Sequence, residues 1–389
     1  MAESSSPPSA GTYQAPSLGS MLRYFLRLGA LGFGGPIALA GAMHRDLVET
    51  RGWISEEDYR EGLTLAQLSP GPLAAQLAIY LGYVSGGILG ATLVGLAFIL
   101  PSFLMVLGLA ALYLAFGGLR WMQAAFYGVG AAVIGLIIRS AVKLAKSTLR
   151  RDPLAWGIFL VLALTTAWTG KEWVSLILLA GLLAWFVRGR PFRAGAIVGG
   201  MVPAWLLTGA QGAASGTALL GILAFFAKAG LFVFGSGLAI VPFLHHGVVV
   251  ENHWLTERQF LDAVAVAMIT PGPVVITVAF IGYLVAGPLG ACAAAAGVFL
   301  PVYLVVILAA PFFRRYGQQP DLKAIVQGVT AGATGAIAGA VVVLGRGAIR
   351  DLPTALLALA TLVLVWRTRV PEPLLILGAA LAGLALFKG

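Results

Sequence analysis

The chain has 389 residues, of which 59% are hydrophobic and only 10% are charged. A soluble chain carries roughly 25% charged residues, so this composition excludes the soluble classes and indicates an integral membrane protein. The net charge of +10 would suggest nucleic acid as the partner of a soluble protein, but no folded basic module accompanies it. We therefore expect no nucleic-acid binding and place the basic residues in loops beside the lipid bilayer, where they set orientation.

The N-terminal residues 1–21 are expected to form a flexible tail. They are rich in Ser, Pro and Gly and lack the charged n-region and apolar h-region of a signal peptide. The single cysteine, Cys292, excludes an internal disulfide.

The rest of the chain consists of two sequence repeats, because residues 25–185 recur at 226–386 almost without gaps. The first copy has the landmarks Gly32-Phe33-Gly34-Gly35-Pro36, His44, Trp53, Pro70-Gly71-Pro72 and Gly82-Tyr83, and the second has Val233-Phe234-Gly235-Ser236-Gly237, His245, Trp254, Pro271-Gly272-Pro273 and Gly282-Tyr283. A duplicated membrane chain with Gly/Pro-interrupted apolar segments at matching positions is typical of secondary transporters and points to their binding site. We predict a first membrane repeat over 22–189, a linker with a membrane span over 190–218 and a second repeat over 219–389.

The apolar segments follow one another in the same order in both halves. They fall at about 22–42, 62–84, 86–116, 119–138, 153–169 and 172–188, and again at about 219–248, 262–286, 288–312, 323–345, 352–367 and 371–388. With an extra stretch at 192–210, the pattern predicts an all-α polytopic protein with about 12–13 membrane segments. Each repeat has an even number of segments, so it begins and ends on the same side of the membrane. One extra span between the repeats then makes the second repeat begin on the opposite side, so we expect inverted repeats. Alternatively, the Gly-rich first segment of each half is a re-entrant hairpin, which changes the number of crossings.

Loop charges predict an orientation. With the N-terminus inside, most of the 25 basic residues fall in cytoplasmic loops. If every apolar segment crosses the membrane, the loop at 45–61 then faces the periplasm and the loop at 251–261 faces the cytoplasm. Hydroxyl-plus-acid patterns at Ser55 and Thr256 predict that a helix starts in each of these loops.

The Pro-Gly-Pro triplets at Pro70-Gly71-Pro72 and Pro271-Gly272-Pro273 are the strongest candidates for a substrate site. Two prolines in three residues break a helix, and broken helices at membrane depth are tolerated only where they are buried or line a cavity. The helix that restarts after the break presents free N–H groups and a positive dipole end, which suit an anion. Ser69 and Thr270 precede the breaks and add hydroxyl groups. The alternative is a kink that only shapes packing, which the pairing of the triplets disfavours.

Small residues at Gly34-Gly35 and Gly235-Ser236 also indicate helix breaks at a substrate site. The indication is weaker than that of the triplets, because small residues also let membrane helices pack closely. Arg27 and Lys228 occupy matching positions within or near apolar segments. A charge there is costly and indicates function, although both side chains could instead reach to the membrane surface. A symmetric pair of cations would suit a divalent anion.

His44, His245, Glu61 and Asp262 also match across the repeat and are candidates for gating or proton relay. We favour interfacial loop positions for the histidines and helix capping for the two acids. A catalytic zinc site needs three well-spaced ligands, so we predict no metal. The chain also lacks a phosphate-binding GxxxxGK[ST] motif and common hydrolase motifs. We therefore expect no cofactor and no enzymatic activity.

Together, the FGGP stretch at 33–36, the loop around Trp53, the Pro-Gly-Pro triplets and the fused duplication resemble the chromate ion transporter family in its long-chain, two-domain form. The resemblance covers nearly the whole chain from Leu22, although the second copy reads Phe234-Gly235-Ser236-Gly237 in place of FGGP. It implies a multi-pass protein of the bacterial inner membrane that exports chromate and thereby confers chromate resistance, with sulfate as a competitor. The remaining alternatives are a sulfate or other oxyanion carrier, an anion channel and an intramembrane enzyme.

Overall fold

The computed structural model describes residues 16–33, 35–116, 119–169, 174–188, 216–231, 240–316, 320–368 and 370–387. Within these ranges all regular structure is helical, which confirms the all-α class. Four helical stretches are long and apolar enough to cross a membrane: Leu73–Phe116, Arg120–Lys146, Val274–Leu308 and Ala324–Ala348. The predicted linker span, Gly34, Gly235 and Ser236 lie outside the described residues.

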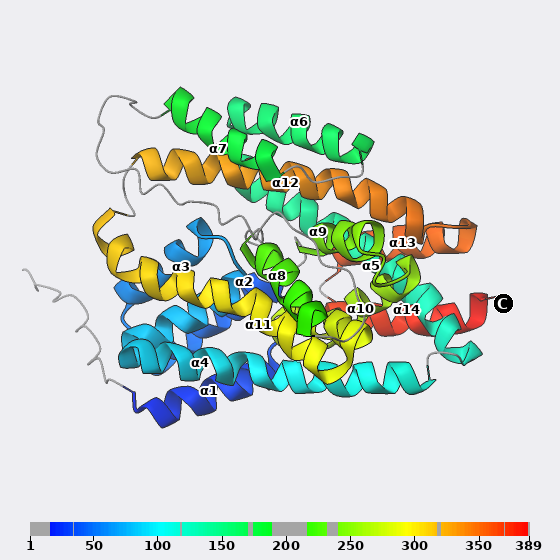
Figure 1. The fold of residues 1–389 in the computed structure, drawn as a ribbon, viewed down its shortest axis with the longest axis horizontal. Coiled ribbons are helices and arrows are strands. Elements are labelled where there is room, and N and C mark those ends of the chain that lie inside the picture. The colour runs from blue at the N-terminus through cyan, green and yellow to red at the C-terminus, as the bar shows by residue number, and fades with distance from the viewer. Residues whose placement is uncertain are drawn as a thin grey trace, which may run out of the picture.

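The helices follow the same order in both halves (Figure 1). The first half consists of α1 (Leu18–Leu31), α2 (Gly35–Met43), a π-helical turn (His44–Thr50), α3 (Glu56–Leu68), α4 (Leu73–Phe116), α5 (Arg120–Leu149), α6 (Pro153–Thr169) and α7 (Val174–Arg188). The second half consists of α8 (Gly216–Leu231), α9 (Ile240–His245), a π-helical turn (His246–Glu251), α10 (Glu257–Ile269), a 3₁₀ turn (Val274–Ile276), α11 (Thr277–Tyr316), α12 (Pro320–Ala348), α13 (Leu352–Arg367) and α14 (Glu372–Leu386).

The first apolar segment does not cross the molecule but folds back on itself between α1 and α2. The Tyr24 hydroxyl of α1 donates over 3.3 Å to the carboxylate of Asp46, which lies in the π-helical turn that follows α2. Farther along the chain, the Arg51 guanidinium lies 5.4 Å from the centre of the Tyr24 ring. Gly35, at the start of α2, has φ of +76°, which favours glycine. The first segment is therefore a re-entrant hairpin, which was the alternative to a membrane crossing in the sequence analysis.

The second apolar segment is also a hairpin, whose tip is the Pro-Gly-Pro triplet. A Cβ on Gly62 of α3 would lie 2.3 Å from the Tyr80 ring of α4, so the two arms run side by side in opposite directions. Helix α4 then reverses again at Gly86 and Gly87, where the backbone leaves helical geometry. It therefore has a short arm at 73–85 and a long arm at 88–116.

These reversals correct the predicted topology. A Cβ on Gly86 would lie 3.8 Å from the side chain of Leu18, so the turn after the second hairpin is beside the start of α1. The loop at 45–61 consequently lies on the same side as the start of α1, not on the opposite side as expected. Hydropathy detected the apolar length of both segments but could not distinguish a chain that crosses from one that turns back at its midpoint.

The second repeat reproduces the first down to single hydrogen bonds. The Trp53 amide donates to the carbonyl of Leu47 over 2.8 Å, and the Trp254 amide donates to Val248 over 2.8 Å. Ala286 and Gly287 break α11 with nearly the same backbone angles as Gly86 and Gly87 break α4.

One difference lies just after the second triplet, where this repeat is shorter by one residue. The Ile276 amide donates to Pro273 over 2.9 Å, a 3₁₀ bond, whereas the Gln76 amide reaches Pro72 over 3.0 Å in α-helical spacing. A tighter turn thus absorbs the missing residue.

Equivalent long helices of the two repeats cross in opposite directions (Figure 1). On α5 and α12, a Cβ on Gly345 would lie 4.0 Å from Ile134, while Ala141 packs with Ile337. Residue numbers rise on one helix as they fall on the other, so the two helices are antiparallel. Such pairing requires a pseudo-two-fold axis across the helices, which is the geometry of inverted repeats.

The short helices at the end of each repeat pack against the other repeat. A Cβ on Gly335 of α12 would meet the backbone carbonyl of Phe159 in α6, and one on Gly128 of α5 would meet that of Ala379 in α14. Glycine therefore permits the close helix contacts that hold membrane proteins together. Figure 1 shows α6 and α7 alongside α12.

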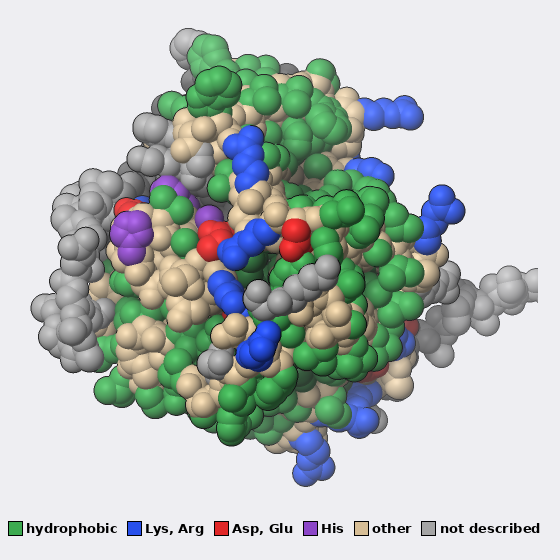
Figure 2. Space-filling view, turned by 90° about the vertical axis from the view of Figure 1, so that its right-hand side faces the viewer, with side chains coloured by type: hydrophobic (Ala, Val, Ile, Leu, Met, Phe, Trp, Pro, Cys, Tyr) green, Lys and Arg blue, Asp and Glu red, His purple; other side chains and the backbone are tan. Residues whose placement is uncertain are grey.

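Charged side chains gather at one end of the molecule. Figure 2 shows acidic and several basic side chains near the middle of that end, with hydrophobic side chains around them.

Candidate functional site

The hairpin tip of the second repeat meets the first hairpin of the first repeat. The Gly272 amide donates to the Gly32 carbonyl at the end of α1 over 2.8 Å. A Cβ on Gly272 would lie 2.7 Å from the Ser102 hydroxyl of α4 and 3.1 Å from the carbonyl of Gly29. Because φ at Gly272 is also +98°, only glycine fits this contact.

The other tip makes the mirrored contact. A Cβ on Gly71 would lie 3.0 Å from the side chain of Val302, which is the counterpart of Ser102 on α11. The φ angle at Gly71 is +137°, again a region that favours glycine. Each Pro-Gly-Pro tip therefore rests on the long helix of the opposite repeat.

Both tips lie at about half the depth of the molecule. Ser102 is at the middle of the long arm of α4, residues 88–116, so roughly 21 Å of helix separates it from either end. In membrane transporters, substrate sites form at this depth, at the repeat interface and from broken helices.

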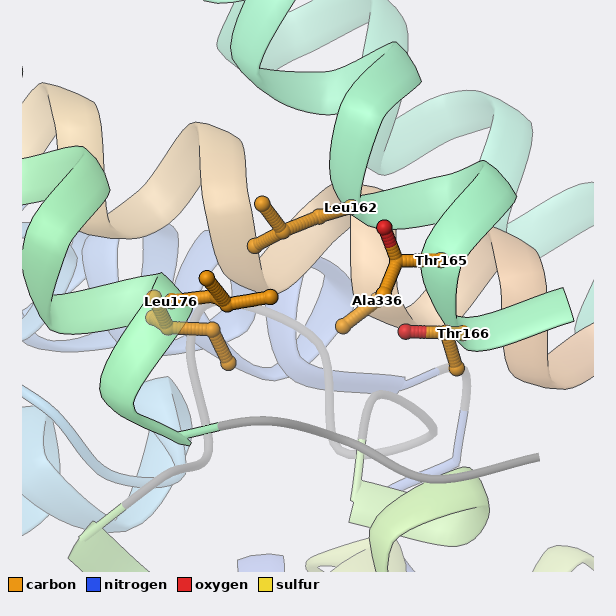
Figure 3. Close-up of a pocket in the computed structure, with 6 residues that line it drawn as sticks. Leu162, Thr165, Thr166, Leu176 and Ala336 are labelled. Atoms are coloured by element: carbon orange, nitrogen blue, oxygen red, sulfur yellow. The ribbon is translucent and has the colours of Figure 1, made fainter. Parts of the chain in front are cut away.

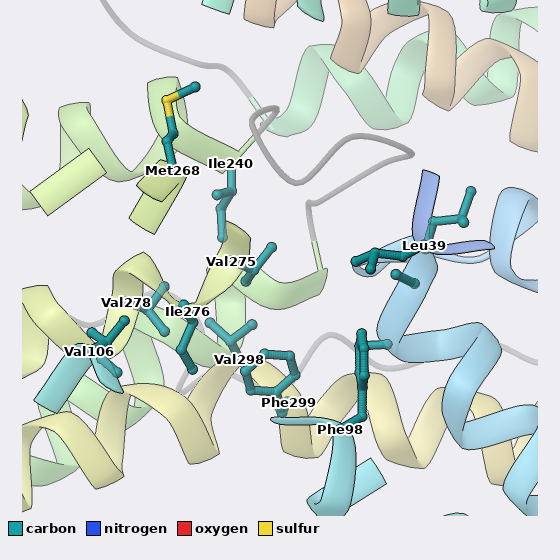
Figure 4. Close-up of a cluster of buried hydrophobic side chains, with 14 of the residues drawn as sticks. Leu39, Phe98, Val106, Ile240, Met268, Val275, Ile276, Val278, Val298 and Phe299 are labelled. Atoms are coloured by element: carbon teal, nitrogen blue, oxygen red, sulfur yellow. The ribbon is translucent and has the colours of Figure 1, made fainter. Parts of the chain in front are cut away.

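The helix that follows the first tip begins in a buried setting. Leu73, Ala74 and Ala75 are 5%, 2% and 0% exposed. The first N–H groups of a helix have no partner within it and form the positive end of its dipole. Figure 4 shows the apolar side chains around the second tip, where Val275 and Ile276 gather with Val298 of α11. This arrangement suits an anion that has lost its water shell.

Gln76 is a residue of this site that the sequence reasoning missed. Its side chain is fully buried, and its amide nitrogen donates to the Pro70 carbonyl over 2.7 Å and to the Ser69 hydroxyl over 3.2 Å. Its oxygen has no hydrogen-bond partner. A lone amide in the apolar run after the triplet was the available signal, because polar groups inside membrane segments indicate function.

The hydroxyl groups before the two breaks bond to their own helices. Ser69 donates to the Leu65 carbonyl and Thr270 donates to the Val266 carbonyl over 2.7 Å. Their protons are thus engaged in this conformation, while their oxygens can still accept hydrogen bonds.

The two cations lie on the arms of the first hairpins rather than at the Pro-Gly-Pro tips. Arg27 is exposed, on the face of α1 opposite Phe25 and Gly29, which pack inward. Lys228 of α8 is half-buried. The structure therefore places the pair in different surroundings.

The matched histidines connect the two hairpins of each repeat. His44 Nε2 lies 2.8 Å from the Glu56 carboxylate, and His245 Nε2 lies 2.6 Å from that of Glu257. The hydrogen bond from His44 holds the pKa of Glu56 below its ordinary value. Within the described ranges, no three His, Cys, Asp or Glu side chains come together as a metal site.

The two matched acids are not helix caps, contrary to our expectation. The caps are Ser55, which accepts from the Asp58 amide over 3.0 Å, and Thr256, which accepts from the Gln259 amide over 3.3 Å, so the predicted helix starts are confirmed. Asp262 lies well inside α10.

Asp262 is only 3% exposed, and the Tyr113 hydroxyl donates to it over 2.7 Å, whereas Glu61 of α3 is half-buried. A capping interpretation failed because the acids follow the cap by more than one turn.

A small apolar crevice lies elsewhere, among α6, α7 and α12 (Figure 3). Its lining includes Leu162, Thr165, Thr166, Leu176, Ile177 and Ala336. It has no charged lining residue, so it offers nothing to an anion.

Comparison with known proteins decides the family. The model of the family described as "Chromate transporter" matches residues 19–185 and 220–384. The chain belongs to the chromate transporter family. The resemblance seen in the sequence is thereby confirmed, and the two matched regions agree with a two-repeat, multi-pass membrane protein.

Several relatives of this chromate transporter family member extend over nearly the whole chain. A "Chromate transport protein" from Cupriavidus metallidurans is 59% identical, covering 95% of this chain and 94% of its own length. A "Probable chromate transport protein" from Synechococcus elongatus is 57% identical, covering 97% of both chains. A "Chromate transport protein" from Pseudomonas aeruginosa is 32% identical, covering 93% of this chain and 91% of its own. No solved structure matches the chain.

Proposed function

We propose that this protein exports chromate from the cytoplasm across a bacterial inner membrane and thereby confers chromate resistance. The observation that carries the proposal is the meeting of two glycine-tipped hairpins from opposite repeats at mid-depth, with a hydrogen bond from Gly272 to Gly32. Relatives named as chromate transport proteins, at 59% and 57% identity, support the choice of substrate.

The proposed site replaces the water shell of a tetrahedral dianion with backbone N–H groups. A polar or charged group that leaves water without new partners pays a large penalty. The helix starts after Pro72 and Pro273 supply donors and positive dipole ends. Ser69, Pro70, Gly71, Thr270, Pro271 and Gly272 shape the two tips, and we propose that Gly34, Gly35, Gly235 and Ser236 complete the site from the first hairpins.

Arg27 and Lys228 add positive charge a few residues before the Gly-containing stretches at 32–36 and 233–237. We assign them to attracting the anion toward the tips, because exposed charge raises the local concentration of an oppositely charged ligand. We expect the half-buried Lys228 to contribute more to this attraction than the exposed Arg27, whose charge is screened by the surrounding ions.

The membrane potential supplies a driving force for export. An inside-negative potential favours the outward movement of negative charge by about 2.3 kcal/mol per charge per 100 mV. For a dianion the gain is about 4.6 kcal/mol per 100 mV. Export therefore requires no nucleotide-hydrolysing domain in the chain.

The orientation follows from basic residues on the side where α1 begins. That side carries Arg23, Arg45, Arg51, Arg60, Arg150, Arg151 and Arg188. By the positive-inside rule it faces the cytoplasm. The hairpins of the first repeat then open toward the cytoplasm, and those of the second repeat open toward the periplasm, so they can serve as inner and outer gates.

Chromate uptake into everted membrane vesicles tests this function. Vesicles that contain the protein should accumulate radioactive chromate when an inside-positive potential is imposed, and excess sulfate, a dianion of the same shape, should compete. Vesicles without the protein are the control. Uptake no faster than in the control would overturn the proposal. A preference for sulfate would show that sulfate, and not chromate, is the substrate.

A further inference from the structure

We propose that an anionic phospholipid of the cytoplasmic leaflet binds between the second half of α5 and the connection from α13 to α14. Its phosphate is held by Lys143 of α5 and by Arg367 at the end of α13, which are both exposed. Because α5 belongs to the first repeat and α13 to the second, the bound headgroup joins the two repeats. This site is separate from the hairpin tips, and its occupation by lipid does not depend on the transported substrate.

Helix α13 runs alongside α5 toward the cytoplasmic side. The Tyr127 hydroxyl of α5 donates over 2.6 Å to Asp351, the cap of α13. Farther along both helices, a Cβ on Gly135 would lie 2.8 Å from the carbonyl of Ala358. Residue numbers rise together on the two helices, so the helices are parallel. Extending this register to Arg367 places the end of α13 level with the turn of α5 that carries Lys143.

Helices α13 and α14 are shorter than the apolar core of a bilayer. They have 16 and 15 residues and are therefore about 24 and 22 Å long, whereas the hydrocarbon core is about 30 Å thick. A bilayer accommodates such short segments by becoming thinner around them. The connection between the two helices carries Arg367 and Glu372. Local thinning brings lipid phosphates to these charged residues.

Cations outnumber acids at this level. The Glu372 carboxylate lies 3.6 Å from the Arg139 guanidinium of α5. Lys143, one turn beyond Arg139 on the same face of α5, also acts on the charge of Glu372. In the part of the chain that the structure describes, neither Lys143 nor Arg367 forms an ion pair. A phosphate group complements the two side chains through charge-assisted hydrogen bonds, and basic pockets between helices on the cytoplasmic side suit anionic headgroups.

Exposed apolar side chains continue from Arg367 along the outer face of α13. Leu359, Val363 and Trp366 are 57%, 48% and 56% exposed. Their spacing, and that of Arg367 four residues after Val363, places all of them on one face of the helix. Acyl chains can lie against this face while the phosphate meets the cations, and tryptophan is enriched at the level of the headgroups. The continuity of cations and apolar surface favours a phospholipid over a free anion.

The other repeat has no cation at the three equivalent positions. Arg139, Lys143 and Arg367 correspond to Gly339, Val343 and Ala167. A Cβ on Gly339 would lie 2.3 Å from the carbonyl of Ala163, so this position serves the packing of α12 on α6 instead. The fold alone therefore does not require the cations. Because the repeats are inverted, their presence in one copy restricts the site to the cytoplasmic leaflet.

Lipid binding to the full chain, purified in a neutral detergent, tests the proposal. Phosphatidylglycerol and phosphatidylcholine with the same acyl chains are titrated separately, and bound lipid is counted by native mass spectrometry. The wild type should bind phosphatidylglycerol about tenfold more tightly, and Lys143→Gln and Arg367→Gln should each weaken this binding about fivefold. Arg346→Gln, which removes an exposed cation near the other end of α12, is the matched control and should bind like the wild type.

Two further measurements separate this site from a general loss of structure and from a site for free anions. Glu372→Gln removes the acid beside the phosphate, so phosphatidylglycerol should bind more tightly, which a disrupted structure would not cause. Excess inorganic phosphate should not displace the lipid, because it has no acyl chains. Equal affinity for the two lipids, wild-type binding in Lys143→Gln or Arg367→Gln, no gain in Glu372→Gln, or displacement by inorganic phosphate would overturn the proposal.

Discussion

The two Pro-Gly-Pro hairpins have the same architecture but are fastened differently. The inner tip is tied to its own hairpin by Gln76, which bonds the Pro70 carbonyl over 2.7 Å. The outer tip has Ile276 in the corresponding 3₁₀ turn and is tied to the other repeat, through the bond from Gly272 to Gly32. The backbone breaks are thus common to both repeats, while the side chains that hold each tip have diverged. This difference predicts two gates with unequal control.

Substitution of the tip glycines should have the largest effect. Gly71→Ala and Gly272→Ala each place a Cβ within 3.0 Å of neighbouring atoms, in a backbone conformation that costs about 1–3 kcal/mol without glycine. We expect chromate uptake to fall more than tenfold in both. Gly108→Ala, on the long arm of α4 with open space around it, is the matched control and should transport normally. Normal uptake in either tip variant would remove that tip from the site.

Loss of the Gln76 amide should come next and should affect only the inner tip. Gln76→Leu keeps the side-chain volume but leaves the Pro70 carbonyl without its donor, at about 1–3 kcal/mol. Uptake should fall several-fold, and the melting temperature in detergent should drop. Gln67→Leu, an exposed glutamine on the same hairpin, serves as the control. Equal behaviour of the two variants would show that the amide does not hold the tip.

The two cations should differ in the same assay. Lys228→Gln should reduce uptake more than Arg27→Gln, because Lys228 is half-buried whereas Arg27 is exposed and its charge is screened by salt. Lys146→Gln is the control: this exposed residue of α5 has no role in the proposed site, so its substitution should have little effect. Wild-type rates in both variants, at matched expression, would show that neither cation contributes to transport and that only backbone dipoles stabilise the anion.

The exposed histidine–glutamate pair should give the smallest effect. The hydrogen bond from His44 lowers the pKa of Glu56 below 4.5, so the ionised form stabilises the fold at higher pH. That contribution is lost as the pH falls through the lowered pKa. Glu56→Gln should therefore reduce the melting temperature by at most about 2 °C at neutral pH, and the difference should vanish in acid. A difference that grows in acid would contradict this sign.

Much of the fold could be predicted from local patterns. The triplet at 70–72 breaks the chain as proline chemistry requires. The helix starts at Ser55 and Thr256 cap as their residue types predict. The inverted arrangement was predicted from an even number of crossings in each repeat together with one extra span between the repeats. Replacing two crossings in each repeat with hairpins leaves the number even, in agreement with the antiparallel α5 and α12.

The features that escaped prediction depend on contacts between distant residues. Whether a broken segment crosses or turns back is decided by packing such as that of Gly62 on Tyr80. Asp262 was interpreted as a cap because its partner, Tyr113, belongs to the other repeat. Hydropathy and spacing describe single segments, so they cannot reveal which segment supplies a partner.

Thiol labelling of matched loop positions tests the inverted hairpins most directly. Thr50 and Glu251 are equivalent, exposed residues at the ends of the two π-helical turns. Thr50→Cys and Glu251→Cys would each be made in a Cys292→Ala background and treated with a membrane-impermeant reagent. We predict that intact cells label only the Glu251→Cys variant and that everted vesicles label only the Thr50→Cys variant. Labelling of both variants from the same side of the membrane would contradict the inverted arrangement on which the two-gate site depends.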